Sequence, residues 1–243
     1  MSTEAGQLHK TWNRQQPPVL TITPGERVSL KAPDASDGEL SRDSTTHDIA
    51  QIDYRNLDPL VGPNYVEGAH PGDALEITVL ELTPLGWGWS GLLPNFGLLS
   101  DEIRDPFLKI WDLDAGYIEV PSGARFPLHP MIGCIGVAPA QDGDFATITP
   151  TNAAGNIDVR YLTAGATLTV PVFNDGALLS AADGHALQGE GEISGTAIEC
   201  PMQMTLQVDL IKGAHLDALE LLVPDTYPAE EGYRISPASD RTL

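Results

Sequence analysis

Glycine and proline interrupt this chain along its whole length. There are 24 Gly and 20 Pro among 243 residues. Proline removes a backbone donor from a helix, and glycine in a helix interior costs roughly 0.5–1 kcal/mol relative to alanine. A chain broken this often disfavours long helices. Its core is therefore expected to consist of short strands joined by turns.

Several segments between these breaks alternate apolar and polar residues with period two. In the segment MTLQVDLI, Met204, Leu206 and Val208 face one way and the polar residues between them face the other. Similar alternation predicts further strands at 26–32, 74–82 and 166–173. Turn sequences lie between the predicted strands, at 23–26, 70–73, 121–124 and 174–177. This pattern predicts a mainly β fold of sandwich or barrel type.

Helical signals are weak. The best candidate is the segment SDEIRDPFLKIWD at 100–112, which Pro106 interrupts. No internal repeat, low-complexity segment or linker stands out. We therefore expect residues 1–243 to form a single domain.

The charge of the chain excludes some classes of partner. Lys and Arg total 13 against 34 Asp and Glu, a formal net charge of −21. Nucleic acids and anionic membranes both require a positive protein face, so neither is an expected partner. The polar N-terminus and the lack of an apolar run of roughly 18 residues point to a cytoplasmic protein. Cys134 and Cys200 lack metal-type spacing and are expected to be free thiols.

One glycine-rich stretch, SAADGHALQGEGEISGTAIE at 180–199, concentrates side chains suited to chemistry. In an extended segment Asp183 and His185 share a face, because strand side chains repeat every two residues. An Asp and a His on one face can bind a divalent metal. Glu190 and Glu192 also share a face and offer a further ligand or a general base. The alternative is an acidic, glycine-rich surface loop.

Other segments carry weaker candidates. His47 in TTHDIAQID could complete a metal shell, or it could simply be solvated. Asp158 follows the turn formed by Gly155 and Asn156, and it could point into a cleft or belong to an ordinary Asx-type turn. The chain lacks the GxSxG, P-loop, HExxH and GxGxxG motifs, which disfavours the enzyme classes that depend on them.

The aromatic run GWGWSGLLPNFGLLSDE offers a possible pocket wall. Trp87 and Trp89 share a face if this run is extended, and they could line a pocket or an interface, or pack in the core. Asp101 and Glu102 at its end are candidates for acid–base chemistry. His129, between two prolines, is either a positioned donor or a packed core residue.

Taken in order, five blocks of the chain resemble the acetamidase/formamidase family. They are GPNYVEGAHPGDALEITVLEL, WGWSGLLPNFGLLSDE, FPLHPMIGCIGVAPA, GNIDVRYLTAGATLTVPVF and DGHALQGEGEISGTAIE. The resemblance covers most of the chain. It implies a β-sandwich with extra strands and a few short helices, and hydrolysis of short-chain aliphatic amides such as formamide and acetamide to ammonia and a carboxylate. It also implies a metal-dependent site and a homo-oligomer.

The resemblance also points to particular residues. The polar positions of the family fall here on Asn156, Asp158, Asp183, His185, Gln188, Glu192 and Glu199. Two positions depart from the family pattern: Ala154 replaces the first of two glycines, and Glu190 replaces an aspartate. Family members generally continue past the position of Leu243, so the resemblance implies a chain that is short at its C-terminus.

The chemistry of amide hydrolysis predicts roles for the residues of this set. Hydrolysis requires a polarised carbonyl, an activated water and a proton for the departing amine, and a divalent metal can supply the first two. We expect Asp183 and His185 as metal ligands, with His47 and Asp158 as weaker candidates, around zinc or, alternatively, calcium. Glu192 is the expected general acid/base. Asn156 and Gln188 are expected to hydrogen-bond the amide or the developing oxyanion.

Two other functions fit the same residues. One is a different metal-dependent C–N hydrolase on the same scaffold, acting on a urea-like, cyclic or larger amide. The other is a non-catalytic relative, which the departures at Ala154 and Glu190 and the short C-terminus favour.

Overall fold

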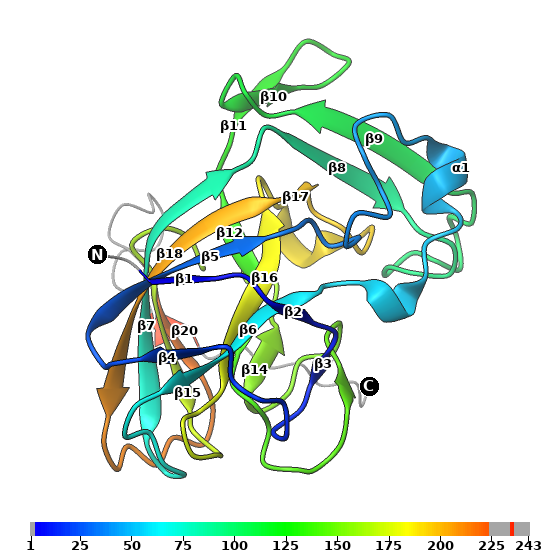
Figure 1. The fold of residues 1–243 in the computed structure, drawn as a ribbon. Helices are drawn as coiled ribbons and strands as arrows, with labels where there is room; N and C mark the ends of the chain where they lie inside the picture. Colours follow the sequence, from blue (N-terminus) through cyan, green and yellow to red (C-terminus); the bar gives the residue numbers. More distant parts are fainter. Residues whose placement is uncertain (1–2, 224–233, 236–243) are drawn as a thin grey trace.

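Two large sheets dominate the computed structural model, which describes residues 3–223 and 234–235 (Figure 1). The first sheet has seven strands, in the spatial order β1 (Thr3–Ala5), β5 (Glu26–Ala32), β18 (Met202–Ile211), β7 (Ala74–Pro84), β15 (Thr167–Pro171), β19 (Glu220–Leu222) and β20 (Arg234–Ile235). The long strands β5, β7, β15 and β18 pair antiparallel. The alternation in the sequence therefore correctly predicted the centre of this sheet.

The second sheet has nine strands and carries most of the polar side chains of interest. Its main path is β14 (Ala154–Asn156), β12 (Met131–Gly136), β16 (Leu179–His185), β17 (Glu199–Cys200), β8 (Trp87–Leu92) and β9 (Phe107–Asp112). Off this path, β6 (Leu60–Val66) pairs with β16, β2 (Leu8–His9) and β4 (Leu20–Ile22).

The remaining elements are short. Two small sheets pair β10 (Tyr117–Glu119) with β11 (Arg125–Pro127) and β3 (Thr11–Trp12) with β13 (Phe145–Ala146). The described residues also include three short helical segments: α1 (Thr46–Ile49), η1 (Tyr54–Asn56) and η2 (Glu190–Glu192). The expected β-sandwich with extra strands and a few short helices is confirmed.

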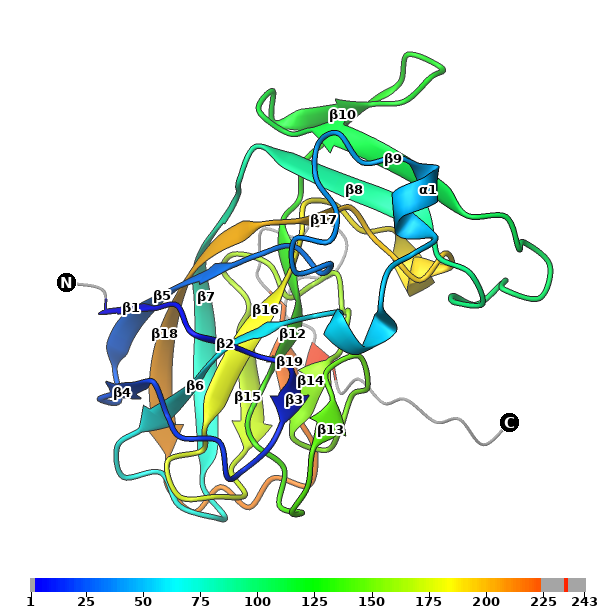
Figure 2. The same ribbon diagram turned by 45° about the vertical axis from the view of Figure 1, so that its right-hand side comes forward.

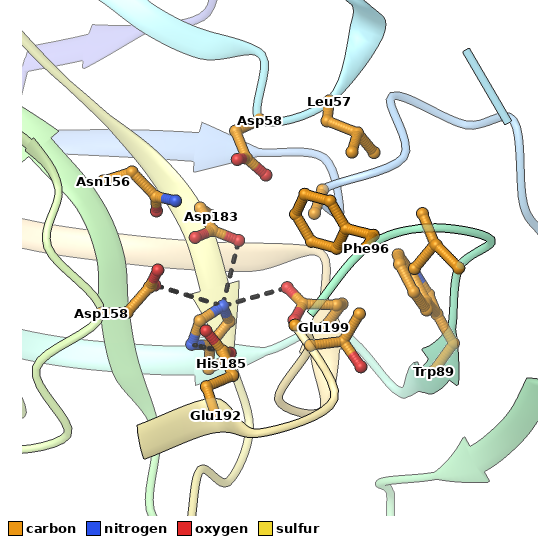
Figure 3. Close-up of a pocket in the computed structure, with 14 residues that line it drawn as sticks. Leu57, Asp58, Trp89, Phe96, Asn156, Asp158, Asp183, His185, Glu192 and Glu199 are labelled. Atoms are coloured by element: carbon orange, nitrogen blue, oxygen red, sulfur yellow. Dashed lines mark hydrogen bonds and ion pairs between the residues drawn. The ribbon is translucent and has the colours of Figure 1, made fainter. Parts of the chain in front are cut away.

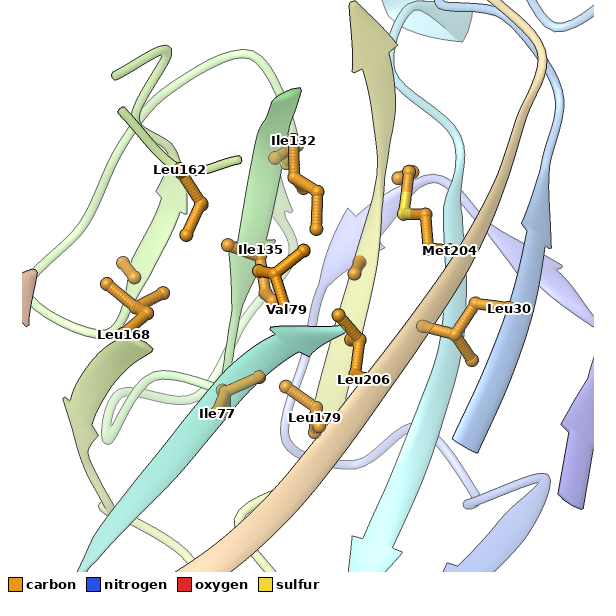
Figure 4. Packing of buried hydrophobic residues seen from close by; sticks show 14 of the residues in the cluster. Leu30, Ile77, Val79, Ile132, Ile135, Leu162, Leu168, Leu179, Met204 and Leu206 are labelled. Carbon is orange, nitrogen blue, oxygen red and sulfur yellow. The ribbon is translucent and has the colours of Figure 1, made fainter. Parts of the chain in front are cut away.

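The main hydrophobic core lies between the two large sheets. Leu30 of β5 and Leu206 of β18 belong to the same buried cluster as Leu179 of β16 and Ile135 of β12 (Figure 4). Cys134 and Cys200 are buried in it as free thiols, as expected. Burying these apolar faces is the main source of stability for a sandwich of this kind.

A second, smaller core lies where β8 and β9 extend away from the main body toward α1 (Figure 2). It contains Ile49 of α1, Trp89 of β8, and Leu57 and Leu93 from the adjoining loops. Side chains of this smaller core line one pocket together with polar side chains of β16 and β17. The position of that pocket therefore depends on how β16 and β8 join through β17.

The helix expected near residues 100–112 is not present. Phe107–Asp112 forms β9, which pairs antiparallel with β8. Leu108 and Ile110 lie on one face of the strand and pack against the smaller core. Pro106 precludes a continuous helix, and the alternation that follows it matches a strand buried on one face.

Candidate functional site

Strands β16 and β17 bring together three polar side chains. Asp183 and His185 are two residues apart on β16, and Glu199 of β17 lies directly opposite His185 in the strand register. All three side chains are buried. Asp183 and His185 therefore meet as their spacing predicted, although the φ of Asp183 is 56° and departs from a regular extended strand. The neighbouring strand β17 adds a second carboxylate.

His185 is the centre of this group (Figure 3). Its Nε2 lies 3.1 Å from Asp183 Oδ1, 3.0 Å from Glu199 Oε2 and 4.0 Å from Asp158 Oδ1. On the other side of the ring, Nδ1 lies 3.9 Å from Glu192 Oε1. One imidazole is thus surrounded by four carboxylates from three separate parts of the chain.

Asp158 reaches this group from the segment that follows β14. The backbone N–H groups of Ile157 and Asp158 both donate to the carbonyl of Gly133, at 3.0 and 3.2 Å. Gln188 Nε2 donates to the backbone carbonyl of Asp158 at 3.1 Å. These bonds hold Asp158 over the centre of β12.

Gly133 forms the floor beneath the carboxylates. A Cβ atom at this position would lie 2.1 Å from Asp183 Oδ2, 2.5 Å from Asp158 Oδ1 and 2.9 Å from His185 Cε1. These distances are far below van der Waals contact. The three side chains can therefore converge only because residue 133 has no side chain.

The group opens into a pocket whose apolar walls come from the smaller core. Asp158, Asp183, His185, Glu192 and Glu199 form one side, and the remaining lining includes Asn156, Asp58, Leu57, Trp89, Leu93, Phe96 and Thr196. The cavity volume is about 40 Å³, where a single water requires roughly 10–15 Å³. This space suits a molecule of about three or four non-hydrogen atoms.

Trp89 and Asp58 also line the pocket. Trp89 is buried in the smaller core and also lines the pocket, so both expectations for it hold; its Nε1 donates to Asp34 Oδ1 at 2.9 Å. Trp87 packs against the same core and does not line the pocket. Asp58 precedes β6, and its carboxyl points into the cavity (Figure 3).

Some expected site residues lie elsewhere. His47 is exposed on α1, outside the pocket, where Thr45 and Asp48 form a capping box that starts the helix. The polar residues around His47 thus serve local helix formation. Gln188 is buried but acts on the backbone of Asp158 and does not line the pocket.

Three further candidates are also outside the pocket. Asp101 and Glu102 are exposed in a turn, and His129 is exposed just before β12. The side chain of Glu190 lies outside the described residues.

The buried carboxylates have strongly perturbed proton affinities. Burial, with the neighbouring Asp183 charge, raises the pKa of Asp158 to about 7. Burial raises the pKa of Asp183 to about 6, although His185 opposes the change. Burial and then Asp158 raise the pKa of Glu192 to about 8. Burial lowers the pKa of His185, but Asp183 and Glu199 outweigh it and hold that pKa well above its usual value.

The residues of the pocket fit a divalent cation. Five buried polar atoms have no hydrogen-bond partner among the described residues: Asn156 Oδ1, Asp158 Oδ1, His185 Nδ1, Glu192 Oε1 and Glu199 Oε2. Potential ligand atoms of Asp158, Asp183 and His185 lie within 4.8 Å of one another, as do those of His185, Glu192 and Glu199. None of the described lining residues is Lys or Arg. Buried carboxylates of this number require a compensating positive charge.

The raised pKa values predict how the metal-free protein responds to pH. Asp158, Asp183 and Glu192 hold protons in the folded state up to about pH 7, 6 and 8, whereas the unfolded chain releases them near pH 4. The folded state therefore binds more protons across this window, and the free energy of unfolding falls as pH rises from about 4 to 8.

We expect the melting temperature of chelator-treated protein to drop by roughly 5 °C or more between pH 5.5 and pH 8, since 1 kcal/mol corresponds to about 2–4 °C in a chain of this size. Added divalent metal should largely remove the drop, because it compensates the ionised carboxylates. Differential scanning calorimetry on metal-free and metal-loaded samples tests this. A drop of the same size in both samples would contradict it.

Three residues of the site could not be identified individually from the sequence. Gly133 sits within an apolar strand, where an interior glycine can signal a close approach. Asp58 is a polar residue directly before Pro59 and a buried strand, and Phe96 lies in the aromatic run. Each of these sequence features can be seen in the chain, but none of them shows that the residue lies at a functional site until the fold is known.

Membrane insertion finds no support in the described helices, since none of them is long and apolar enough to span a bilayer.

Comparison with known proteins agrees with the geometry. The acetamidase from Mycolicibacterium smegmatis is 29% identical over 279 residues, covering 88% of this chain and 68% of the relative. The formamidase from Methylophilus methylotrophus is 27% identical over 264 residues, covering 85% and 65%. The chain thus spans about two thirds of the length of these curated relatives.

The same relationship appears in three dimensions. The crystal structure of an acetamidase from Bacillus halodurans superposes with a TM-score of 0.84 at 29% identity, covering 90% of this chain and 74% of that one. The model of the acetamidase/formamidase family matches residues 1–143 and 142–231, which include every side chain of the pocket. By sequence and by fold, this chain belongs to the acetamidase/formamidase family.

Proposed function

We propose that this protein is a metal-dependent amidase that hydrolyses short aliphatic amides, with formamide and acetamide as substrates, to ammonia and the carboxylate. The observation that carries the proposal is the pocket itself. It is small, it holds four carboxylates around His185, and five of its buried polar atoms have no hydrogen-bond partner among the described residues. The names of the relatives support the choice of substrate.

Asp158, Asp183 and His185 would hold the metal. Zinc accepts both imidazole nitrogen and carboxylate oxygen as ligands, and three protein ligands is the number that catalytic zinc sites use. Calcium, the alternative, prefers oxygen ligands alone, and His185 therefore favours zinc. When bound, such an ion polarises a carbonyl and lowers the pKa of a water molecule toward about 7.

Glu192 is the proposed proton carrier. It faces the cluster from η2, and its Oε1 is buried without a hydrogen-bond partner among the described residues. Burial raises the pKa of Glu192 to about 8, and a group that both accepts and releases a proton works best when its pKa lies near the working pH. Glu192 would take the proton of the attacking water and transfer it to the departing amine.

Asn156 and Gln188 have different proposed roles. Asn156 lines the pocket, and its buried Oδ1 has no partner among the described residues, so it can bind the substrate directly. Gln188 instead bonds the backbone of Asp158. It is a positioning residue, in place of the substrate contact expected from the sequence.

Ammonia release from formamide, acetamide and propionamide tests the function. The assay compares protein stripped with a chelator and the same protein refilled with zinc or with calcium. Activity that appears only on refilling supports the proposal. Turnover of cyclic or urea-like amides alone would indicate a different C–N hydrolase. A folded, metal-loaded protein that releases no ammonia from any amide would indicate a non-catalytic relative.

Phe96 is expected to limit the size of the acyl group. It lines the small pocket and also an adjoining apolar hollow of about 350 Å³ formed by Leu92, Leu99, Ile103 and Ile193. Its ring packs against Gly195, where a Cβ would lie 2.6 Å from Phe96 Cδ1. Removing this ring would join the two spaces.

We expect Phe96→Ala to raise the kcat/KM of butyramide relative to acetamide by roughly 10-fold, because each of two extra methylenes gains about 0.8 kcal/mol on burial. Steady-state kinetics on the two amides measure the ratio. Phe107→Ala is the matched control, since Phe107 is 52% exposed on β9 and lines neither space. An unchanged ratio in Phe96→Ala would show that another residue limits the substrate.

A homo-oligomer is part of the proposal through the family resemblance, and a cytoplasmic location is part of it as a prediction from the sequence. Large apolar side chains exposed beside the hollow, including Leu98 at 74% and Ile193 at 51%, are the surface we expect an oligomer to cover. Analytical ultracentrifugation of the full chain tests the oligomer, and a monomer at micromolar concentration would contradict it.

A further inference from the structure

Asp58 is a buried carboxylate without a hydrogen-bond donor. It is 7% exposed, and no described residue donates a hydrogen bond to its side chain or pairs with it as an ion. Leaving a buried carboxylate unpaired costs considerable free energy. A residue retained at that cost either balances a charge or meets a ligand that arrives later.

A second buried aspartate nearby shows how the protein normally satisfies such a group. Asp34 Oδ1 accepts from the backbone N–H of Ser36 at 3.0 Å and from Trp89 Nε1 at 2.9 Å. These bonds give Asp34 a structural role beneath Trp89. Asp58 has no comparable partners, so the fold does not explain its carboxylate.

The backbone holds Asp58 firmly in its position. Its N–H donates to the carbonyl of Ala35 at 2.9 Å, and the carbonyl of Leu57 accepts from Thr147 Oγ1 at 2.8 Å. The φ angle of Asp58 is 52°, a region that Asp tolerates better than most residues. The carboxyl is thereby aimed into the pocket (Figure 3).

Asp58 is also not one of the residues whose ligand atoms lie close enough together to hold a cation. The two groups of ligand atoms that lie within 4.8 Å of one another contain Asp158, Asp183, His185, Glu192 and Glu199, but not Asp58. Asp58 faces the small cavity from the wall that carries Leu57 and Phe96. A small molecule in the cavity would therefore lie between Asp58 and the cluster.

We propose that Asp58 accepts a hydrogen bond from the amino group of the substrate amide and so favours amides that carry an N–H over esters and N,N-dialkyl amides. This inference rests on the proposed function. A primary amide has an acceptor oxygen and N–H donors on the same trigonal carbon, pointing in different directions. With its nitrogen at Asp58, the molecule presents its carbonyl to Asp158, Asp183 and His185. An ester or an N,N-dialkyl amide has no N–H to offer and would leave Asp58 unpaired.

The test compares Asp58→Ala, Asp58→Asn and Asp37→Ala. Asp37 is a matched control because its φ is also 52° and it pairs with Lys10 at the surface, outside the pocket. The measurements are zinc content per chain, melting temperature after chelator treatment, and kcat/KM for acetamide and for methyl acetate, which keeps the acetyl group but has no N–H.

We expect Asp58→Ala to lower kcat/KM for acetamide by 10- to 100-fold, the range that an unpaired buried polar group costs. Zinc content should be unchanged, the melting temperature should be unchanged or higher, and the preference for amide over ester should fall by the same factor. Asp58→Asn keeps an acceptor oxygen and should retain more activity than Asp58→Ala. Asp37→Ala should behave as the wild type.

Other outcomes would overturn the proposal. Loss of zinc in Asp58→Ala would make Asp58 a metal ligand, and a lower melting temperature with an unchanged amide-to-ester ratio would make it structural. Wild-type acetamide turnover is the reference for the proposed function. If the wild type is active and Asp58→Ala equals it, only the role of Asp58 fails; if the wild type is inactive on all amides, the proposed function itself fails.

If the protein does not turn over the ester at all, a binding measurement replaces the amide-to-ester ratio. Calorimetry then compares acetamide binding to two zinc-loaded proteins, the Glu192→Gln variant and the Glu192→Gln/Asp58→Ala double variant. Binding at least 10-fold weaker in the double variant supports the role of Asp58. Equal binding overturns it.

Discussion

A Gly133→Ala variant will fold but will lose its divalent metal and its amidase activity. The added Cβ would lie 2.1 Å from Asp183 Oδ2 and 2.5 Å from Asp158 Oδ1. These atoms would have to move apart, and the ligands could no longer converge on one ion. We expect metal affinity to fall at least about 100-fold, at or beyond the upper range for losing supporting contacts around a metal.

Metal content after dialysis and ammonia release from acetamide measure this effect together. The overpacking itself should cost about 1–3 kcal/mol of stability, so the variant should still show the circular dichroism spectrum of a β protein. Gly189→Ala is the matched control, because a Cβ at that position would have no atom within 4 Å. A Gly133→Ala variant with normal metal content would contradict the assignment of the ligands.

A Glu192→Gln variant will bind metal but will not turn over amides. The substitution keeps the shape of the side chain and removes its ability to carry a proton. General acid–base catalysis contributes typically 10²–10⁴-fold. We therefore expect kcat for acetamide to fall by about that factor, with little change in metal content.

The matched control is Glu102→Gln. Glu102 is exposed and lies outside the pocket, so the same chemical change there should leave kcat unaltered. Loss of metal from Glu192→Gln would instead place Glu192 among the ligands, as its proximity to His185 and Glu199 permits. Near-normal turnover with metal bound would remove Glu192 from the mechanism.

The strands were the most predictable feature of this chain. In β18 the apolar residues Met204, Leu206 and Val208 are buried and the polar residues between them are only partly so. This works because alternation is a local property that every antiparallel strand with one buried face must satisfy. The helix expected at 100–112 failed for the complementary reason. Its acidic start looked helical, but packing of Leu108 and Ile110 against a distant core decided the outcome.

The candidate site was predictable only in part. The spacing of Asp183 and His185 correctly indicated a shared face on one strand. The family resemblance indicated Asn156, Asp158, Glu192 and Glu199, which the structure brings to the same pocket. His47 had a similar local appearance, yet it lies exposed on α1. Composition around a histidine does not reveal which way its segment will face.

By itself, the sequence determined what depends on neighbours along the chain: short strands, their buried faces, the turns between them, and the pairing of Asp183 with His185 on one face. The tertiary structure decided which distant segments meet. Glu199 reaches His185 through strand register, and Asp158 through the backbone bonds to Gly133. Asp58 reaches the pocket wall through a turn whose backbone bonds to Ala35. Such contacts depend on how whole sheets pack and on where a side chain is absent. A linear pattern does not contain that information, because the free energy that selects the arrangement comes from the core as a whole.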